Sequence, residues 1–514
     1  MLPLETFLAW GADAALVLGV IIFGNGVLQN LVYVLQLALS FRALRRRGIP
    51  PDTLTAWWRL NEQTMPISLL VPAFGEEETI VESVRSMLAL HYPEFEVIVI
   101  NDGSKDRTLE VLIETYELES IDRAFNESVS HKGIKAVYGS DRHPKLIVID
   151  KDNGGKADAL NAGINLARAP LFCVVDADSL LEADSLLRAV QPFLIEPDDV
   201  VAVGGSIRLA NGSTIRSGRV ASIGLPSNML ALFQVVEYLR AFLIARLAWS
   251  EMDALMLVSG AFGIFRRSIA IAVGGFSHGT VGEDMEIIVK IHRHLREHNI
   301  NYGIRYVPDP VCWTEAPESL AVLRRQRTRW QRGALETFFK HIRMLGNPRY
   351  GLAGTVGYVY VFSSDVIGPV LEAMGYFLMP LFWYLGILSW EFFLAYMALT
   401  FVFGVFISVC SMALEEMELR RMLKPADLVV LTGVAILENF GYRQLNNLWR
   451  IQGWWQFLRG TKEWGADAAQ GLSATLSETP GNMIPRVVAE IGSGSCVDGY
   501  PNRAIHTENT VAVS

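Results

Sequence analysis

The sequence predicts an α/β domain with a mainly parallel sheet, inserted between membrane-spanning helices. The hydrophobic share of the 514 residues is 51% and the mean hydropathy is +0.27, which is high for a purely soluble protein. Long apolar blocks lie near the start of the chain and after residue 350, with a region of ordinary polarity between them. Within that region, short apolar runs alternate with helical patterns.

The first apolar block, roughly residues 12–41, is almost free of charge (ALVLGVIIFGNGVLQNLVYVLQLALSF). It is longer than the ~20 residues that cross a hydrocarbon core of ~30 Å, so we expect a spanning helix. A cleaved signal peptide would carry its positive charge first, whereas here Arg42, Arg45, Arg46 and Arg47 follow the apolar block. The positive-inside rule then places this end of the helix in the cytoplasm and the N-terminus outside.

The central region, roughly residues 65–345, contains the apolar runs ISLLVPAF, FEVIVIND, KLIVID, LFCVVDAD and VVAVGG. Continuous runs rich in β-branched residues suit strands that are buried on both faces of a parallel sheet with covering helices. Three of these runs end in acidic residues. Because ligands of open α/β sheets bind beyond the carboxyl ends of the strands, we expect the chemistry at those ends.

Apolar character returns in three blocks, at about 355–388, 391–414 and 427–448, and each block can span a membrane. The first is too long for one simple crossing. The third carries Glu438, Arg443 and Gln444, which are costly in lipid and indicate a polar lumen or an interfacial position.

The segment RIQGWWQFLRGTKEWG, with Trp454 and Trp455, looks like an interfacial amphipathic helix that serves as an anchor or a gate. The small, polar residues after about 465 predict disorder. The expected parts are an N-terminal transmembrane helix (1–48), a linker (49–64), a cytosolic α/β domain (65–345), C-terminal transmembrane and interfacial helices (346–465) and a disordered tail (466–514).

Charge and cysteine content exclude other classes of protein. The formal net charge of -9 and the lack of a zinc-finger module argue against a nucleic-acid partner. No disulfide framework or metal-ligand spacing is indicated by the scattered cysteines Cys173, Cys312, Cys410 and Cys496.

Three polar segments follow predicted strands. Asp102 lies in an Asn-Asp-Gly-Ser turn, which by itself is more often a simple connection than a site. Lys156 lies in the glycine-rich loop KDNGGKADALN, where a lysine can meet phosphate. Asp176 and Asp178 form an Asp-x-Asp (DxD) pair at a strand end, where the chain turns and both carboxylates can converge on one Mg²⁺ or Mn²⁺ ion.

Read in order, the motifs P-x-x-x-E, NDGS, GGKADALN, DAD, SGAFGIFRR, GED and QRTRW resemble those of the family 2 inverting glycosyltransferases. The resemblance covers residues 65–345 and is strongest to the membrane-embedded cellulose, hyaluronan and poly-N-acetylglucosamine synthases. It implies a cytosolic GT-A-type domain with a Rossmann-like mixed sheet, in an integral protein of the bacterial inner membrane.

The resemblance also implies a function. A hexosyltransferase of this family would use Mg²⁺ or Mn²⁺ to move a sugar from UDP-N-acetylglucosamine or UDP-glucose onto a growing β-linked polysaccharide. We also expect that synthesis is processive and coupled to export. The expected partners include membrane lipids and an accessory export subunit. Two alternatives remain open, namely transfer of a single sugar to a membrane lipid acceptor and a non-catalytic membrane scaffold.

Carried over position by position, the resemblance assigns the donor site. Asp102 matches the aspartate that recognises uracil, with Glu76 near the nucleoside. Asp178 matches the direct metal ligand, and Asp176 lies beside the nucleotide and the metal. Two further residues match the loop that borders the donor, Lys156 and Asn161.

The acceptor side is assigned in the same way. The segment near the acceptor sugar is matched by Ser259, Gly260 and Ala261, and Asp284 matches the catalytic base. Inversion requires a group that takes the proton of the attacking hydroxyl, and a carboxylate can do so. Glu283 is the rival base, and an acidic pair is also favoured simply by a helix N-terminus.

The basic stretch RRQRTRWQRG contains the motif Gln-x-x-Arg-Trp (QxxRW) at Gln326, Arg329 and Trp330. The resemblance implies that the arginine holds the diphosphate and that the tryptophan forms a platform under the acceptor. The other arginines of the stretch are expected to face headgroups or cytosol, namely Arg324, Arg325, Arg327 and Arg332. The chain departs from the family pattern at Phe74 and Gly75, where an asparagine commonly precedes the acid, and at Gly282, where threonine is common.

Overall fold

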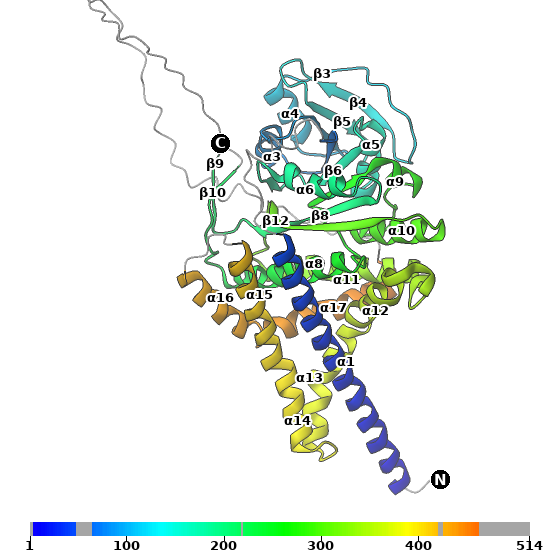
Figure 1. The fold of residues 1–514 in the computed structure, drawn as a ribbon, viewed down its shortest axis with the longest axis vertical. Coiled ribbons are helices and arrows are strands. Elements are labelled where there is room, and N and C mark those ends of the chain that lie inside the picture. The colour runs from blue at the N-terminus through cyan, green and yellow to red at the C-terminus, as the bar shows by residue number, and fades with distance from the viewer. Residues whose placement is uncertain (1–3, 48–63, 217–218, 420–424, 462–514) are drawn as a thin grey trace, which may run out of the picture. The chain divides into compact units, whose positions relative to one another are not determined.

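The computed structural model describes residues 4–47, 64–216, 219–419 and 425–461. Its α/β domain contains a ten-stranded mixed sheet in the order β3-β4-β5-β2-β1-β6-β11-β8-β12-β7 (Figure 1). This topology confirms the predicted α/β class with a mixed sheet. The expectation of a mainly parallel sheet is wrong, because the added strands β3, β4, β7 and β11 pair in the antiparallel direction. The expected tail (466–514) and all but the last residue of the expected linker (49–64) lie outside the described residues.

Four neighbouring strands of the sheet are parallel, and they are formed by the first four apolar runs of the sequence, whereas the run VVAVGG forms β8. The four parallel strands are β1 (Ile67–Ala73), β2 (Phe95–Asn101), β5 (Leu146–Lys151) and β6 (Leu171–Val175). Parallel strands end at the same edge of the sheet, so the residues that follow these four strands are brought together there.

Both faces of the parallel strands are buried because successive side chains point to opposite sides. Val97 and Val99 pack with helices α3 (Ile80–Leu88), α4 (Thr108–Tyr116) and α6 (Ser185–Ile195). Ile98 and Ile100 instead pack with α5 (Lys156–Leu166), α9 (Arg267–Ala272) and α10 (Glu283–Glu297). This two-sided burial explains why the strand sequences are continuously apolar.

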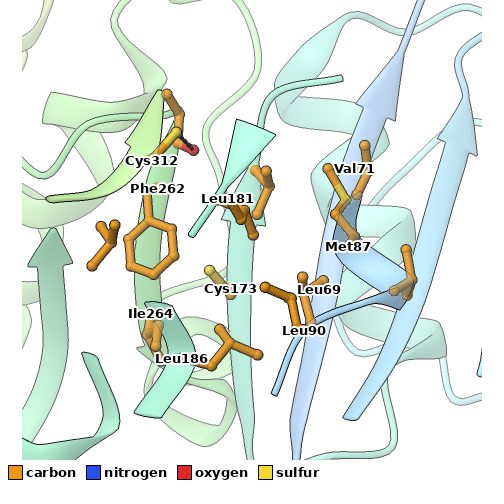
Figure 2. Packing of buried hydrophobic residues seen from close by; sticks show 14 of the residues in the cluster. Leu69, Val71, Met87, Leu90, Cys173, Leu181, Leu186, Phe262, Ile264 and Cys312 are labelled. Carbon is orange, nitrogen blue, oxygen red and sulfur yellow. Dashed lines mark hydrogen bonds between the residues drawn. The ribbon is translucent and has the colours of Figure 1, made fainter. Parts of the chain in front are cut away.

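The remaining strands complete the sheet and a separate hairpin. Figure 2 shows how Cys173 of β6 and Phe262 and Ile264 of β11 pack in the first of the two cores. The described cysteines, Cys173, Cys312 and Cys410, are free thiols. The other strands are β3 (Glu119–Ser120), β4 (Ile134–Gly139), β7 (Leu180–Leu181), β8 (Val200–Leu209), β9 (Thr214–Arg216), β10 (Arg219–Ser222), β11 (Phe262–Arg266) and β12 (Gly303–Thr314).

Two of the described helices are long and apolar enough to cross a membrane, Asp13–Arg46 within α1 (Leu4–Arg47) and Trp390–Leu414. The pair Ala353–Val366 and Gly368–Tyr384 passes the same test only together and is bent by 42°. This agrees with the expectation that the block 355–388 is not one simple crossing. The elements after residue 341 are η2 (Ile342–Met344), η3 (Pro348–Tyr350), η4 (Ala353–Gly357), α12 (Tyr358–Val361), η5 (Phe362–Val366), α13 (Gly368–Tyr384), α14 (Trp390–Met397), η6 (Ala398–Val402), α15 (Phe403–Leu419), α16 (Pro425–Leu437) and α17 (Tyr442–Leu458).

Of the two interpretations of residues 427–448, a spanning helix and an interfacial or lumen position, the single spanning helix is not found, because the helix breaks inside this block. The apolar helix α16 ends at Leu437, and α17 begins at Tyr442 after Gly441, whose φ is +104°. Glu438, at the break, is fully buried and pairs with the Arg240 guanidinium. A buried ion pair and a left-handed glycine end the apolar helix short of the length needed to span.

Helices connect the α/β domain to the membrane-type helices. The segment of α7 (Met229–Tyr238), η1 (Leu239–Ala245) and α8 (Arg246–Glu251) packs against α1, α15 and α16. Leu232 and Val236 of α7, for example, share a core with Val434 of α16. Helix α11 (Leu320–Lys340) packs against both α10 and α17.

Candidate active site

The acidic residues predicted from the sequence follow neighbouring strands at one edge of the sheet. Glu76 follows β1, Asp102 follows β2, and the glycine-rich loop 152–155 follows β5. Asp176 directly follows β6, and Asp178 lies in the same turn. The parallel pairing of these strands therefore positions all of them at one end of the domain.

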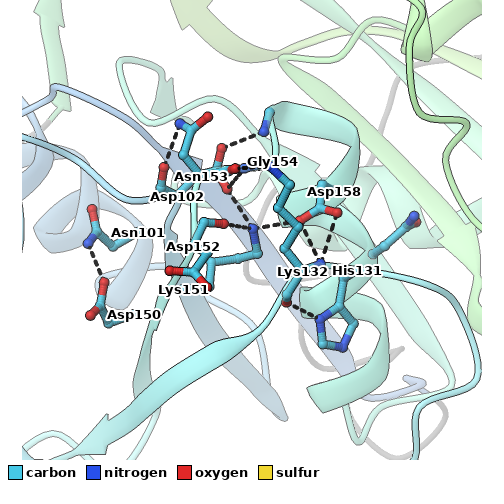
Figure 3. A network of polar contacts seen from close by, with 12 residues as sticks. Asn101, Asp102, His131, Lys132, Asp150, Lys151, Asp152, Asn153, Gly154 and Asp158 are labelled. Atoms are coloured by element: carbon cyan, nitrogen blue, oxygen red, sulfur yellow. Dashed lines mark hydrogen bonds and ion pairs between the residues drawn. The ribbon is translucent and has the colours of Figure 1, made fainter.

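Asp102 anchors the glycine-rich loop through its side chain (Figure 3). Its Oδ1 accepts hydrogen bonds from the Lys151 ammonium at 2.6 Å and from the Gly154 N–H at 2.9 Å, and its Oδ2 accepts one from the Gly155 N–H at 2.7 Å. The Lys151 Nζ atom also lies 2.6 Å from Asp158 Oδ1. Because Lys151 is fully buried, these contacts fix the entry to helix α5 and the place of Lys156 at its start.

Lys156 connects the DxD pair to the expected base. Its Nζ atom lies 2.5 Å from Asp176 Oδ1 and 3.8 Å from Glu283 Oε1. Burial by itself would lower the pKa of Lys156, but the negative charges of Asp176, Glu283 and Asp284 raise it above its ordinary value. Lys156 is therefore a protonated cation between two groups of carboxylates.

Carboxylates at the strand ends repel one another. Burial raises the pKa of Asp178 to about 6, and the charge of Asp176 adds to this, while Lys156 opposes it. Burial, followed by the charge of Asp178, raises the pKa of Glu76 to about 7. Such mutual repulsion favours a bound cation, because a positive ion stabilises the charged form of each group.

The DxD pair fits a shared divalent ion better than a closed protein site. Within the described residues, no group of three or more His, Cys, Asp or Glu side chains is arranged to hold a metal. Mg²⁺ is commonly held by only one or two carboxylates together with substrate phosphates. Asp176 and Asp178 supply that pair of hard oxygen ligands at the end of β6.

The acidic pair begins helix α10. Glu283 and Asp284 are its first two residues, and Asp284 Oδ1 accepts the Met285 N–H at 2.8 Å. Burial raises the pKa of Glu283 to about 7 and raises the pKa of Asp284 above its ordinary value, while Lys156 opposes both shifts. The pKa values of both carboxyl groups are therefore closer to a neutral working pH than those of ordinary carboxyl groups.

The segment with Ser259, Gly260 and Ala261 lies against this pair. A Cβ atom on Gly260 would lie 2.9 Å from Lys156 Nζ and 3.7 Å from Asp284 Cβ. The N–H of Ala261 donates to Ser259 Oγ at 3.4 Å, which closes a turn before β11. The glycine thus permits the close approach of this turn to the lysine and to the expected base.

Asn161 lies apart from these carboxylates and uses its amide internally. Its Nδ2 donates to the Phe276 carbonyl at 3.0 Å and to the Ser130 carbonyl at 3.1 Å, and its Oδ1 accepts the Phe276 N–H at 2.8 Å. These bonds hold the loop before α10. A direct contact of Asn161 with the donor stays a prediction.

Helix α11 carries the QxxRW motif. Gln326 and Arg329 are partly buried, and Trp330 is 43% exposed, with the Arg327 guanidinium 4.4 Å from its ring centre. An exposed indole on a helix next to the acidic pair is available to stack on a ligand.

The expectation of a solvated face is wrong for two of the four remaining arginines. Arg327 and Arg332 are 5% and 3% exposed, whereas Arg324 and Arg325 are exposed. Arg327 pairs with Glu237 of α7 at 2.9 Å. The basic run lies on a helix that other helices cover on more than one side, so its arginines do not share one environment.

Two glycines join α11 to the start of α10. A Cβ atom on Gly282 would lie 2.8 Å from Gly333 Cα, and one on Gly333 would lie 2.7 Å from Gly282 Cα. The departure of Gly282 from the family pattern therefore has a structural reason, since the two backbones meet there. This contact places the QxxRW helix directly beside Glu283 and Asp284.

Sequence reasoning missed Lys151 and Gly333, and both carried a signal. Lys151 directly follows the apolar run KLIVID and is the last residue of the strand. A charged residue is unusual at a fully buried strand position. Gly333 is a glycine inside a helical pattern, which often marks close packing.

Family models match most of the region that holds this site. The description "Glycosyl transferase family 2" matches residues 68–272, and "Glycosyl transferase family group 2" matches residues 171–417. A mannosyltransferase from Pyrobaculum calidifontis, solved with GDP-Man and Mn²⁺, is 19% identical, with a TM-score of 0.47 over 87% of this chain and 98% of that one.

Curated relatives include poly-β-1,6-N-acetyl-D-glucosamine synthases. That of Staphylococcus epidermidis is 29% identical over 280 residues, which are 54% of this chain and 57% of the relative. That of Staphylococcus aureus strain COL is 29% identical over 289 residues, 55% and 59% of the two chains. The matched part is thus less than two thirds of these relatives. From the family matches, which together cover residues 68–417, and from the mixed α/β sheet, we conclude that this chain contains a region similar to the family 2 glycosyltransferases and resembles the poly-β-1,6-N-acetyl-D-glucosamine synthases.

Proposed function

We propose that this protein transfers a sugar from a UDP-sugar, with inversion, onto the growing end of a β-linked polysaccharide. The observation that carries the proposal is the position of Lys156, whose ammonium lies between Asp176 of the DxD pair and Glu283 of the acidic pair. The Lys156 ammonium thus joins the residues proposed for donor binding to those proposed for proton transfer. Similarity to poly-N-acetylglucosamine synthases favours UDP-N-acetylglucosamine over UDP-glucose.

In the proposed reaction, the acceptor hydroxyl attacks the anomeric carbon from the face opposite UDP. A new carbon–oxygen bond forms, the bond from the anomeric carbon to the phosphate oxygen breaks, and the hydroxyl proton passes to Asp284. Glu283 is the alternative base. The raised pKa values of both groups support a base that accepts a proton near neutral pH.

The departing diphosphate needs positive charge. Asp178 and Asp176 would hold Mg²⁺ or Mn²⁺, which neutralises charge on the phosphate oxygens when it is bound. Arg329 contributes a permanent positive charge from α11, and Lys156 contributes an ammonium from the loop after β5.

Recognition is proposed for the remaining predicted residues. Asp102 and Glu76 border the nucleoside, and Asn161 holds a loop near the donor. The Trp330 indole lies under the acceptor, since an indole stacks on the C–H face of a sugar and leaves the sugar hydroxyls free. The turn with Ser259, Gly260 and Ala261, which lies near Lys156 and Asp284, borders the acceptor sugar.

Export is proposed because a cavity that is lined by several polar side chains lies among the membrane-type helices. The cavity has a volume of about 180 Å³ and is lined by residues of α1, η1, η5, α13, α14, η6, α15 and α17. Its lining includes Gln29, Arg240, Glu372 and Asn439. Gln29 Oε1 and Asn439 Oδ1 are buried and have no hydrogen-bond partner among the described residues. Polar side chains with unpaired acceptor oxygens suit a hydroxyl-rich chain, which cannot cross lipid unaided.

Orientation and localisation belong to the same proposal. The arginines at the end of α1, Arg42, Arg45 and Arg46, support a cytoplasmic α/β domain in a bacterial inner membrane. Helix α17 packs on α11, and the Trp454 Nε1 donates to the Val366 carbonyl at 2.8 Å. These contacts favour a gating role for α17 beside the QxxRW helix over a simple anchor.

The test is incubation of the purified protein in lipid with single UDP-sugars and Mg²⁺ or Mn²⁺. We expect UDP release and a long polymer with UDP-N-acetylglucosamine. Products with one added sugar on a lipid would reject processive synthesis in favour of a glycolipid synthase. UDP release that is unchanged in Asp284→Asn would reject the base assignment, and no release with any UDP-sugar would reject the enzyme in favour of a scaffold.

A further inference from the structure

Helix α11 continues the QxxRW motif as a stripe toward its C-terminal end. Gln326, Arg329, Gly333, Glu336 and Lys340 are spaced by three and four residues, so they lie on one face of the helix. Two of these positions belong to the QxxRW motif. The other three contact the turn before α10 or its first turn, which carries Glu283 and Asp284.

Glu336 holds the turn that precedes the acidic pair. Its Oε2 accepts the Val281 N–H at 3.0 Å and the Thr280 hydroxyl at 3.0 Å. The Thr280 hydroxyl oxygen in turn accepts the Gly282 N–H at 3.2 Å. One side-chain carboxylate of α11 therefore organises three successive residues before Glu283.

Two further contacts join α11 to the chain around the acidic pair. Gly282 and Gly333 meet backbone to backbone, because a Cβ atom on Gly282 would lie 2.8 Å from Gly333 Cα. Beyond Asp284, the fully buried Glu286 of α10 contacts Lys340 Nζ at 2.7 Å and His341 Nε2 at 3.1 Å. Helix α11 thus contacts the chain on both sides of the acidic pair.

We propose that Glu336 is a positioning residue, which fixes Asp284 relative to Arg329 by holding the turn 280–282 against α11. The inference rests on the proposed function, in which Asp284 takes the acceptor proton and Arg329 helps to hold the diphosphate. Such positioning matters for the rate of transfer, because a misplacement of about 1 Å in a reacting group can lower the rate about 100-fold.

The experiment uses the full-length protein in lipid and the variants Glu336→Leu and Glu336→Gln. Leucine is similar in size but removes both acceptor bonds, whereas glutamine keeps one oxygen at the same reach. Glu297→Leu is the matched control. Glu297 lies on α10 at its other end, is 31% exposed compared with 25% for Glu336, and accepts bonds from Arg293 and Tyr350 at 3.0 Å.

Four quantities are measured for each variant, namely kcat and KM for UDP release, the affinity for UDP, and the rate of amide hydrogen exchange at residues 280–284. We expect Glu336→Leu to lower kcat by about 10- to 100-fold, with UDP affinity unchanged within about twofold and faster exchange confined to 280–284. Glu336→Gln should restore kcat to within about threefold of the unsubstituted protein, and Glu297→Leu should leave kcat and the exchange at 280–284 unchanged.

The outcomes separate this inference from the proposed function. Equal kcat in Glu336→Leu and Glu297→Leu, or unchanged exchange at 280–284, would overturn the positioning role. A parallel loss of UDP affinity would also overturn it, because the effect would then be a general loss of structure. Without any UDP-sugar turnover in the unsubstituted protein, the proposed function fails, and the exchange data alone decide the role of Glu336. If Glu336→Leu does not fold, Thr280→Val, which removes only the hydroxyl bond, must show the same local exchange change.

Discussion

The ammonium of Lys156 lies 2.5 Å from the carboxylate of Asp176, and the same ammonium lies 3.8 Å from Glu283. One cation at the start of α5 thus contacts two acidic groups that are far apart in the sequence, one after β6 and the other at the start of α10. Its charge lowers the pKa of Asp178, Glu283 and Asp284 relative to what burial alone would give.

Replacing this lysine tests the charge directly. Lys156→Met should lower UDP release at pH 7 by about 100-fold and move the acid side of the pH–rate profile to higher pH, because the neighbouring carboxylates lose a stabilising cation. Lys156→Arg should keep part of the activity. Lys145→Met is the control, since Lys145 lies at the other end of β5 over the Phe95 ring. Similar rates in Lys156→Met and Lys145→Met would contradict the role of Lys156.

The pH dependence of turnover follows from the acidic pair. A base acts only when it is ionised, and burial raises the pKa of Glu283 to about 7 and that of Asp284 above its usual value. Protonation below these pKa values removes the base, so kcat should increase as the pH rises toward and through about 7. Initial rates of UDP release between about pH 5 and 9 measure this, and the pair titrates as a unit.

Substitution of Glu283 and substitution of Asp284 should have different effects on turnover. Glu283→Gln should retain measurable turnover, while Asp284→Asn should lose it, if Asp284 takes the proton. The reverse result would assign the base to Glu283.

Substitutions in the DxD pair should impair donor binding, whereas substitution of Trp330 in the QxxRW motif should impair use of the acceptor. Asp178→Ala should lose UDP affinity that depends on Mg²⁺ or Mn²⁺, because a carboxylate ligand is removed. Trp330→Ala should keep UDP affinity but lower transfer by about 10-fold or more, because the sugar platform is lost. Titration of UDP with and without a chelator measures the first effect. Identical UDP affinities in the two variants would count against both assignments.

The contact of Gly282 with Gly333 predicts an effect of one methyl group. Alanine in a helix interior is ordinarily more favourable than glycine by about 1 kcal/mol. At Gly333 the new Cβ would lie 2.7 Å from Gly282 Cα, so Gly333→Ala should instead destabilise the protein by roughly 1–3 kcal/mol and lower turnover. Thermal unfolding in lipid or detergent measures this. Gly433→Ala in α16, where nothing lies within 4 Å, should be neutral or stabilising.

The sequence predicted the site best where residues follow apolar strands. Asp102, Asp176 and Asp178 could be placed at one sheet edge because parallel strands end together, and this arrangement is confirmed. The contact of Lys156 with Asp176 and Glu283 could not be read from spacing, since it depends on how α5 and α10 pack on the sheet.

Helix surroundings were the least predictable part. The basic run of α11 reads as a solvated face, yet Arg327 is buried against Glu237 because α7 covers that side. In the same way, residues 427–448 read as one spanning block, but the buried Glu438 and the positive φ of Gly441 break it. Hydropathy averages over such breaks, so only the packing of neighbouring helices reveals them.

The ion pair of Arg240 with Glu438 has a consequence for how the protein melts. Arg240 belongs to η1, within the segment that continues the chain of the α/β domain, whereas Glu438 follows α16 beside the membrane-type helices. Pulling these elements apart would leave the Glu438 carboxylate with only the Arg443 guanidinium, at 3.4 Å, as its cation, and loss of one partner of a buried ion pair typically costs about 3–5 kcal/mol. Calorimetry should therefore record a single cooperative transition for both regions, and Arg240→Met should split it into two.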